Sequence, residues 1–120
     1  MGSADGPQVI RRGAEPTRSA GSGTQVWDLV AKQEDGHDLL LAYTEFPPGV
    51  SVGPHVRKYD EFIFYVSGQA EVEDVGTGKV YALSSTESIL IPAGVEHIHR
   101  NVGVGQLRQF YVRSAKLPLE

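Results

Sequence analysis

Turn signals recur about every ten residues along most of this chain, and this spacing constrains the fold more than any other feature of the sequence. None of the segments between the turns holds an apolar period of 3.6 residues long enough for a substantial helix. The sequence therefore predicts an all-β domain of eight or nine short antiparallel strands, closed into a jelly-roll barrel so that few strand edges stay open. The apolar segments expected to form strands are residues 25–31, 39–46, 50–56, 61–66, 70–75, 80–83, 88–91, 96–102 and 107–112.

A chain of 120 residues and 13.0 kDa is expected to form one domain. Residues 1–24 are rich in Gly, Ser, Ala and Pro, and after the initiator only Val9 and Ile10 are sizeable apolar residues. Such a segment buries too little surface to offset the entropy lost on ordering. We therefore expect a flexible N-terminal arm over residues 1–24, with Val9 and Ile10 as a candidate edge strand, and a β-barrel domain over residues 25–120.

The composition excludes several functional classes. With no cysteine, the chain has no disulfide and no thiolate chemistry, so any metal must have nitrogen and oxygen ligands. A formal net charge of -4 disfavours nucleic acids and anionic membrane surfaces as partners. No apolar stretch approaches the roughly 18 residues of a membrane span, and no basic head precedes an apolar run at the N-terminus. We expect a cytoplasmic protein that acts on a small molecule.

Two segments carry polar side chains in strand alternation. His55 and Arg57 share one face, because alternate residues on a strand point to the same side. Glu61 opens the next strand, and in a hairpin its carboxylate can lie beside His55, since cross-strand neighbours are about 5 Å apart at Cβ. If these groups point inward with His97, two imidazoles and one carboxylate converge. That set can hold Fe, Mn, Ni or Zn and leave positions open for substrate or water.

The second segment places His97, His99 and Asn101 on a common face by the same alternation. Ionisable groups that face one small core are costly to desolvate unless they pair or bind something. A purely structural set of buried polar groups that satisfy one another is the alternative interpretation. His37 lies in the turn Asp35-Gly36-His37-Asp38 and is expected to be solvated and without a role.

The two segments resemble the two motifs of the cupin superfamily, whose members are small jelly-roll β-barrels. The resemblance spans roughly residues 25–113 and implies a cupin double-stranded β-helix with a metal site whose ligands are His55, Glu61 and His97. The first motif departs from the family at Arg57, which stands in the place of a second His, and the second motif opens with Thr86 and Glu87 in place of Gly and Asp. The residues that carry the resemblance are Gly49-x5-His55-x-Arg57-x3-Glu61-x6-Gly68 and Pro92-x-Gly94-x2-His97-x3-Asn101.

Arg57 leaves two possibilities open. A guanidinium has no lone pair to donate and repels a nearby cation, so Arg57 is not a metal ligand. It can turn away from the ion and hold a carboxylate or phosphate of the substrate, which leaves a site of two His and one Glu. Alternatively, Arg57 pairs with Glu61 and the barrel works without metal, with His55, His97 or His99 as general acid or base.

Strand parity indicates which other side chains surround the site. Tyr65 shares the parity of Glu61 and should point inward, whereas the direction of Tyr59 is open because a bulge can reset parity. One of two sets should line the pocket: Leu41, Tyr43 and Glu45, or Leu107, Gln109 and Tyr111. Phe62, Phe64 and Val66 form an apolar outer stripe that needs cover, which a homodimer contact or the N-terminal arm could supply.

These observations favour a metal-dependent cupin enzyme, of dioxygenase or isomerase/cyclase type, that acts on a small, oxygen-rich, anionic substrate. His55, Glu61 and His97 are the expected metal ligands, Arg57 the substrate anchor, and His99 or Tyr65 the groups that move protons. Two alternatives are a metal-free acid/base cupin, such as a dehydratase or cyclase, and a non-catalytic cupin that binds a sugar or metabolite.

Overall fold

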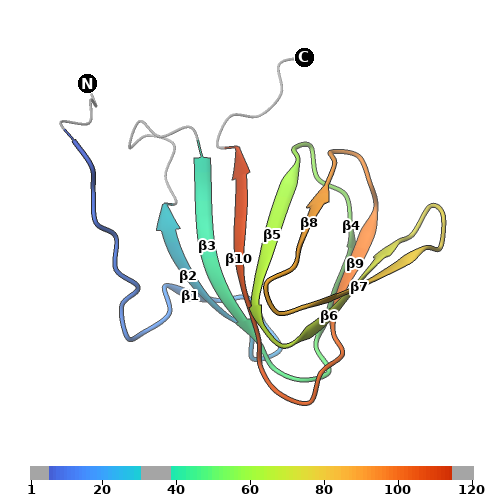
Figure 1. The fold of residues 1–120 in the computed structure, drawn as a ribbon, viewed down its shortest axis with the longest axis horizontal. Coiled ribbons are helices and arrows are strands. Elements are labelled where there is room, and N and C mark those ends of the chain that lie inside the picture. The colour runs from blue at the N-terminus through green and yellow to red at the C-terminus, as the bar shows by residue number, and fades with distance from the viewer. Residues whose placement is uncertain (1–5, 31–38, 115–120) are drawn as a thin grey trace.

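The structure, a computed structural model, describes residues 6–30 and 39–114, which form ten β-strands and no helix (Figure 1). This confirms the predicted all-β class. No helix in these residues is therefore long and apolar enough to cross a membrane. The strands are β1 (Arg18–Ser19), β2 (Gln25–Val30), β3 (Leu39–Phe46), β4 (Ser51–His55), β5 (Glu61–Ser67), β6 (Gln69–Asp74), β7 (Val80–Ser84), β8 (Ser88–Ile91), β9 (His97–Asn101) and β10 (Leu107–Ser114).

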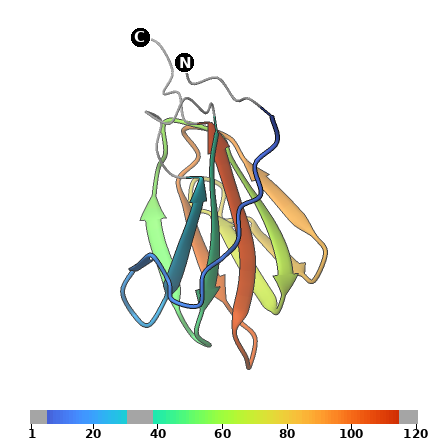
Figure 2. The ribbon, with the colours of Figure 1, turned by 90° about the vertical axis from the view of Figure 1, so that its left-hand side faces the viewer.

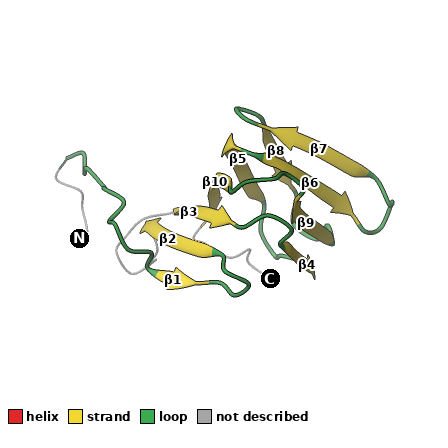
Figure 3. Cartoon of the chain, turned by 90° about the horizontal axis from the view of Figure 1, so that it is seen from below, coloured by secondary structure: helices red, strands yellow, loops and turns green. Residues whose placement is uncertain are grey.

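Two antiparallel sheets face each other (Figure 3). One has six strands in the order β1-β2-β3-β10-β5-β8, and the other has four in the order β4-β9-β6-β7. The long connections between neighbours in these orders are those of a jelly roll rather than a simple meander. The predicted ends of β3 and β8 are confirmed, and the other predicted segments differ from the observed strands by one or two residues at their ends.

Alternation along each strand decides which side chains enter the space between the sheets. In β5 the even-numbered residues are exposed, whereas Glu61, Ile63 and Tyr65 are buried. In β9 the residues buried are His97, His99 and Asn101. The hydrophobic core lies between the sheets and consists of Phe46, Ile63, Tyr65, Ala70, Val72, Ile91 and Leu107. The inward faces expected for β5 and β9 are therefore confirmed.

The N-terminal segment contacts the outer face of the six-stranded sheet, where Figure 2 shows it (blue) running in front of the strands. The guanidinium of Arg12 lies 4.5 Å from the ring centroid of Trp27 and 5.1 Å from that of Tyr43. The indole nitrogen of Trp27 donates a hydrogen bond of 3.0 Å to the carbonyl of Gly13. These contacts account for the burial of two large aromatic residues on the outer side of the barrel.

The short edge strand of this segment is not the one expected. Val9 is 76% exposed and neither it nor Ile10 belongs to a strand. Instead β1 pairs with β2, because Arg18 forms an ion pair of 2.9 Å with Asp28 and lies opposite Val26 in register. Polar contacts hold the edge strand where apolar ones were expected. The flexibility of the arm and the boundary at residue 24 stay predictions.

The outer apolar stripe of β5 is exposed in the single chain. Phe62, Phe64 and Val66 are each more than one third exposed, and Leu90 of the neighbouring β8 lies opposite Phe62 in register. The N-terminal segment covers Trp27 and Tyr43 instead. A homodimer that covers this stripe therefore remains the expected arrangement.

We expect light scattering on the chromatographed protein to give twice the chain mass of 13.0 kDa. Replacing both Phe62 and Phe64 with Lys should reduce the mass to that of one chain, because charges would be buried in the contact. Val104→Lys is the control, since Val104 is exposed on the loop between β9 and β10. A monomeric wild-type protein would contradict the prediction.

Candidate metal centre

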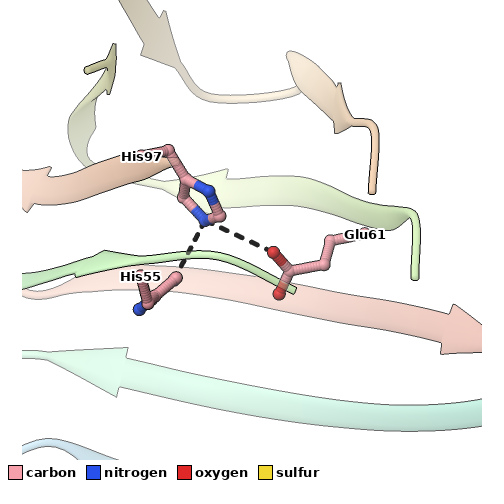
Figure 4. Close-up of side chains that lie close together, drawn as sticks. All are labelled: His55, Glu61 and His97. Atoms are coloured by element: carbon pink, nitrogen blue, oxygen red, sulfur yellow. Dashed lines mark hydrogen bonds and ion pairs between the residues drawn. The ribbon is translucent and has the colours of Figure 1, made fainter. Parts of the chain in front are cut away.

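The structure brings together the three side chains expected to bind a metal. His55 ends β4, Glu61 begins β5 and His97 begins β9. One potential ligand atom from each residue lies within 4.8 Å of the other two (Figure 4). His97 Nε2 is 2.9 Å from His55 Nε2 and 3.3 Å from Glu61 Oε1. Two imidazole nitrogens and one carboxylate oxygen thus converge on one point.

The expected hairpin between His55 and Glu61 is wrong. β4 belongs to the four-stranded sheet and β5 to the six-stranded sheet, so the connection between them crosses from one sheet to the other. His55 lies opposite His97 in the pairing of β4 with β9. Glu61 approaches both imidazoles from the facing sheet. The site therefore depends on the packing of the two sheets and not on a local turn.

Backbone geometry positions both histidines. Gly53 has a φ of +107°, and a Cβ at this position would lie 2.7 Å from the carbonyl oxygen of His97. Only glycine permits this close approach, which accompanies an irregularity in the pairing of β4 with β9. At the ring nitrogen that does not face the site, His97 Nδ1 lies 2.9 Å from the carbonyl oxygen of Val95. Because a carbonyl only accepts, Nδ1 must donate, and Nε2 is left to face the site.

The electrostatics of the site favour the metal-binding forms of His55 and Glu61. Burial, together with the charge of Arg57, lowers the pKa of His55, which favours the neutral, ligand-competent imidazole. The hydrogen bond with Glu61 raises the pKa of His97 against the effect of burial. Burial raises the pKa of Glu61, but the hydrogen bonds from His97 and Tyr111 outweigh it, so the carboxyl pKa is lowered.

Without a cation, the lone pair on neutral His97 Nε2 would face the carboxylate of Glu61. Glu61 Oε1 is buried, and His97 Nε2, 3.3 Å away, can donate to it only when that nitrogen carries a proton. Either a proton on His97 or a metal ion resolves this juxtaposition. The residues present therefore fit a divalent ion held by two nitrogen atoms and one oxygen atom.

Arg57 lies beside this set without entering it. Its Nε is 3.7 Å from Glu61 Oε2. His97 approaches the other carboxylate oxygen, Oε1. The side chain of Arg57 is 40% exposed and lines the cavity in front of the three ligands. Features of both expected arrangements are present: Arg57 approaches Glu61, and its guanidinium still borders the space where a substrate would bind.

His99 and Tyr65 form a buried pair behind the three ligands. The phenol oxygen of Tyr65 is 2.9 Å from His99 Nε2, and the two rings are nearly parallel. Burial raises the pKa of Tyr65, so the phenol keeps its proton. Burial, with the neighbouring histidines, lowers the pKa of His99 to about 4. His99 lines the cavity, whereas Tyr65 contributes through its contact with His99.

Tyr111 and Tyr59 border the site from the side of β10. Burial and the charge of Glu61 raise the pKa of Tyr111, which is hydrogen-bonded to Tyr59 and Glu61. The guanidinium of Arg113 lies 4.2 Å from the ring centroid of Tyr59. Of the set on β10, Gln109 and Tyr111 line the cavity but Leu107 does not. Of the set on β3, Leu41 alone lines it, beside the even-numbered residues of that strand.

A cavity of about 750 Å³ opens in front of the candidate ligands. Its lining combines apolar residues of both sheets with Arg57 and Arg113 near Glu61. At a position more distant along the sheet, Arg18 and Asp28 neutralise each other. The cavity can therefore hold a molecule with apolar and oxygen-bearing parts and with a negative group near Arg57.

Asn101 shares the face of the histidines but has a structural role. Its Nδ2 lies 2.9–3.0 Å from the carbonyl oxygens of Phe46, Pro47 and Gly105, and its Oδ1 accepts from the backbone N–H of Gly103. Asn101 thereby joins two chain reversals at one end of the barrel. His37 lies outside the described residues.

Sequence reasoning missed Gly53 as a positioning residue and Thr24 and Thr44 as part of the cavity wall. A glycine inside a strand is a known signal for a bulge or a close backbone approach, so Gly53 could have been found. The two threonines carry no comparable signal, because only the pairing of β2 with β3 places them on the cavity side.

Several solved structures share this architecture. The polyketide cyclase RemF from Streptomyces resistomycificus superposes with a TM-score of 0.71 at 22% identity, over 92% of this chain and 77% of that one. A predicted oxalate decarboxylase from Thermotoga maritima superposes with a TM-score of 0.75 at 23% identity, over 89% of this chain and 98% of that one. At these identities the likeness shows the fold.

Sequence comparison gives the family. The polyketide synthase CurC of Streptomyces cyaneus is 31% identical over 72 residues, which are 59% of this chain and 46% of that protein. The chain thus spans about half the length of the curated relative it matches. The family model described as a cupin domain matches residues 42–112, more than half of the chain. Together with the two-sheet barrel, this match shows that the chain belongs to the cupin family.

Proposed function

We propose that the protein is a metal-dependent cupin enzyme of the cyclase type, which binds a small, oxygen-rich, anionic substrate in the cavity in front of His55, Glu61 and His97. The observation that carries the proposal is the convergence of these three ligand atoms, from three strands and both sheets, within 4.8 Å. The likeness to a polyketide cyclase and to a polyketide synthase component supports cyclisation over dioxygenation.

The chain's own residues supply binding and proton control in this proposal. A divalent ion bound by the three ligands would act as a Lewis acid toward substrate oxygen atoms. Arg57, next to Glu61 and partly exposed, would hold the anionic group of the substrate. Tyr65 can donate its phenol proton to His99 Nε2, which leaves Nδ1 of His99 as an N–H donor for a carbonyl oxygen in the cavity.

Protein purified without chelators is expected to contain one divalent ion per chain. Removing the ion should lower the thermal midpoint, because a ligand at a hundred times its Kd stabilises the folded state by about 2.7 kcal/mol. For a domain of this size, that free energy corresponds to a fall of roughly 10 °C. Elemental analysis, with thermal unfolding before and after chelation and after addition of Fe, Mn, Ni or Zn, provides the measurement. Absence of metal together with an unchanged midpoint would refute the proposal.

The alternative is a metal-free acid/base cupin, and the proximity of Arg57 Nε to Glu61 Oε2, at 3.7 Å, is the observation that favours it. Arg57→His distinguishes the two. In the metal-free alternative this substitution creates metal affinity where the wild-type protein has none, whereas in the proposed enzyme it adds a fourth ligand to an existing site. A non-catalytic binding cupin would instead bind a ligand tightly without turnover.

A further inference from the structure

Three polar side chains on the cavity floor lack hydrogen-bond partners. Thr24, Thr44 and Gln109 line the cavity and are only 2%, 8% and 3% exposed. Among the residues that the structure describes, Thr24 Oγ1, Thr44 Oγ1 and Gln109 Oε1 have no partner. Buried polar groups are rarely left in this state, because their desolvation is then uncompensated. Three such groups in the wall of one cavity are therefore available to hydrogen-bond a molecule that fills it.

The strand register places these groups together. Gln109 of β10 lies directly opposite Thr44 of β3, and Thr44 lies opposite Val26 of β2. Thr24 precedes Val26 by two residues and therefore has the same parity. The three side chains thus form a polar group, hereafter the floor subsite, on the inner face of β10, β3 and the residue that precedes β2.

The register also separates the floor subsite from the candidate metal centre. Arg113 of β10 lies opposite Glu61, and Gln109 comes four residues earlier on the same strand. At about 3.3 Å per residue, the two positions are about 13 Å apart along the sheet. Tyr111 and Ile63, opposite each other in the row between them, supply mainly apolar surface. Both positions line the same cavity, so a single molecule can reach from one to the other.

The chemistry of the floor subsite selects neutral oxygen groups. A threonine hydroxyl both donates and accepts, and a glutamine amide offers two donors and a carbonyl acceptor. The charged groups nearest in the cavity wall on the β2 side, Arg18 and Asp28, are paired with each other. Carbonyl and hydroxyl groups of a ligand would therefore be preferred over charged ones at this end.

On the basis of the proposed function, we infer that Thr24, Thr44 and Gln109 bind the far end of an elongated, polyoxygenated substrate through its hydroxyl or carbonyl groups. The opposite end of that substrate lies at His55, Glu61, His97 and Arg57. The floor subsite makes the enzyme selective for length and for oxygen at the remote end. A short carboxylic acid would reach only the metal end.

A pair of probes of equal shape tests the floor subsite in the full chain. 2,6-Dihydroxyanthraquinone carries a hydroxyl group at each end of a flat plate, and 2-hydroxyanthraquinone carries one at a single end. We expect the wild-type protein to bind the first about tenfold more tightly or better. The double variant Thr44→Val, Gln109→Met keeps the volume of the wall and removes two of its three hydrogen-bonding groups, so it should lose most of the preference for the dihydroxy probe.

Stability gives a second, independent readout. Without ligand, the double variant is expected to have a higher thermal midpoint than the wild type, because it buries two fewer unpaired polar groups. Thr77→Val, at an exposed turn, is the matched control. It should not raise the thermal midpoint, and it should leave the preference between the probes unchanged. A lower midpoint in the double variant would assign these side chains to the structure and overturn the inference.

Titrations with and without chelator separate this inference from the proposed function. A preference for the dihydroxy probe that persists in metal-free protein and is mostly lost in the double variant supports the floor subsite even if no metal is native to the protein. A wild-type protein that binds stoichiometric metal but does not distinguish the probes, or binds neither, overturns the floor subsite and leaves the metal centre standing.

Discussion

Replacing Glu61 with Gln is expected to abolish stoichiometric binding of a divalent ion without unfolding the barrel. The amide keeps the shape of the side chain but removes the negative charge that lies 3.3 Å from His97 Nε2. Loss of a residue that only orients a metal ligand costs ten- to a hundredfold in affinity, so loss of a direct ligand should cost more than about a hundredfold. Isothermal titration with Zn and elemental analysis measure the effect.

A second consequence of Glu61→Gln can be measured in the metal-free protein. Because the hydrogen bond with Glu61 is the main cause that raises the pKa of His97, the substitution should lower that pKa. Histidine titration by NMR would detect the change. Glu73→Gln is the matched control, since Glu73 pairs with Arg100 at 2.7 Å and does not line the cavity. If Glu61→Gln keeps wild-type metal affinity, the candidate metal centre is wrong.

Asn101→Asp should be the most destabilising of the isosteric substitutions considered. The asparagine Nδ2 group donates toward three backbone carbonyls, and a carboxylate in its place would present only acceptors to them. A buried acceptor left without a donor costs about 1–3 kcal/mol, so the loss of several contacts should exceed about 3 kcal/mol. The thermal midpoint is then expected to fall by more than about 10 °C.

Gln106→Glu provides the control for this change, because it makes the same amide-to-acid replacement at an exposed position between β9 and β10. Its midpoint should stay close to that of the wild type. At temperatures where Asn101→Asp remains folded, its metal affinity should be that of the wild type, since Asn101 contacts none of the three ligands. A stable Asn101→Asp protein, or one that loses metal affinity while folded, would contradict the role assigned to Asn101.

These two substitutions separate residues that the sequence pattern could not. His97, His99 and Asn101 alternate along one strand and are all buried, as their parity predicts. Yet His97 faces Glu61, His99 pairs with Tyr65, and Asn101 binds the carbonyls of two chain reversals. Parity gives the face of a side chain, but the neighbours on that face come from other strands.

The expected hairpin at His55 failed for a related reason. Five residues separate His55 from Glu61, and a connection of that length can return along the same sheet or cross to the other one. Nothing local distinguishes the two courses. The pairing of β4 with β9 and of β5 with β10 and β8 decides it.

The sequence by itself determined the all-β class, the approximate limits of nine strands, the inward faces of β5 and β9, and the three residues that could share a metal ion. It did so because strand alternation and turn chemistry are local properties, and because the spacing of two His and one Glu resembles that of the cupins. Only the tertiary structure decided that Arg57 lies beside Glu61, that Gln109 and Thr44 meet on the cavity floor, and that Arg18 rather than Val9 holds the edge strand. Each of these depends on which distant strands pair and which sheets face each other, and the pairing free energy is spread over many contacts that no short segment contains.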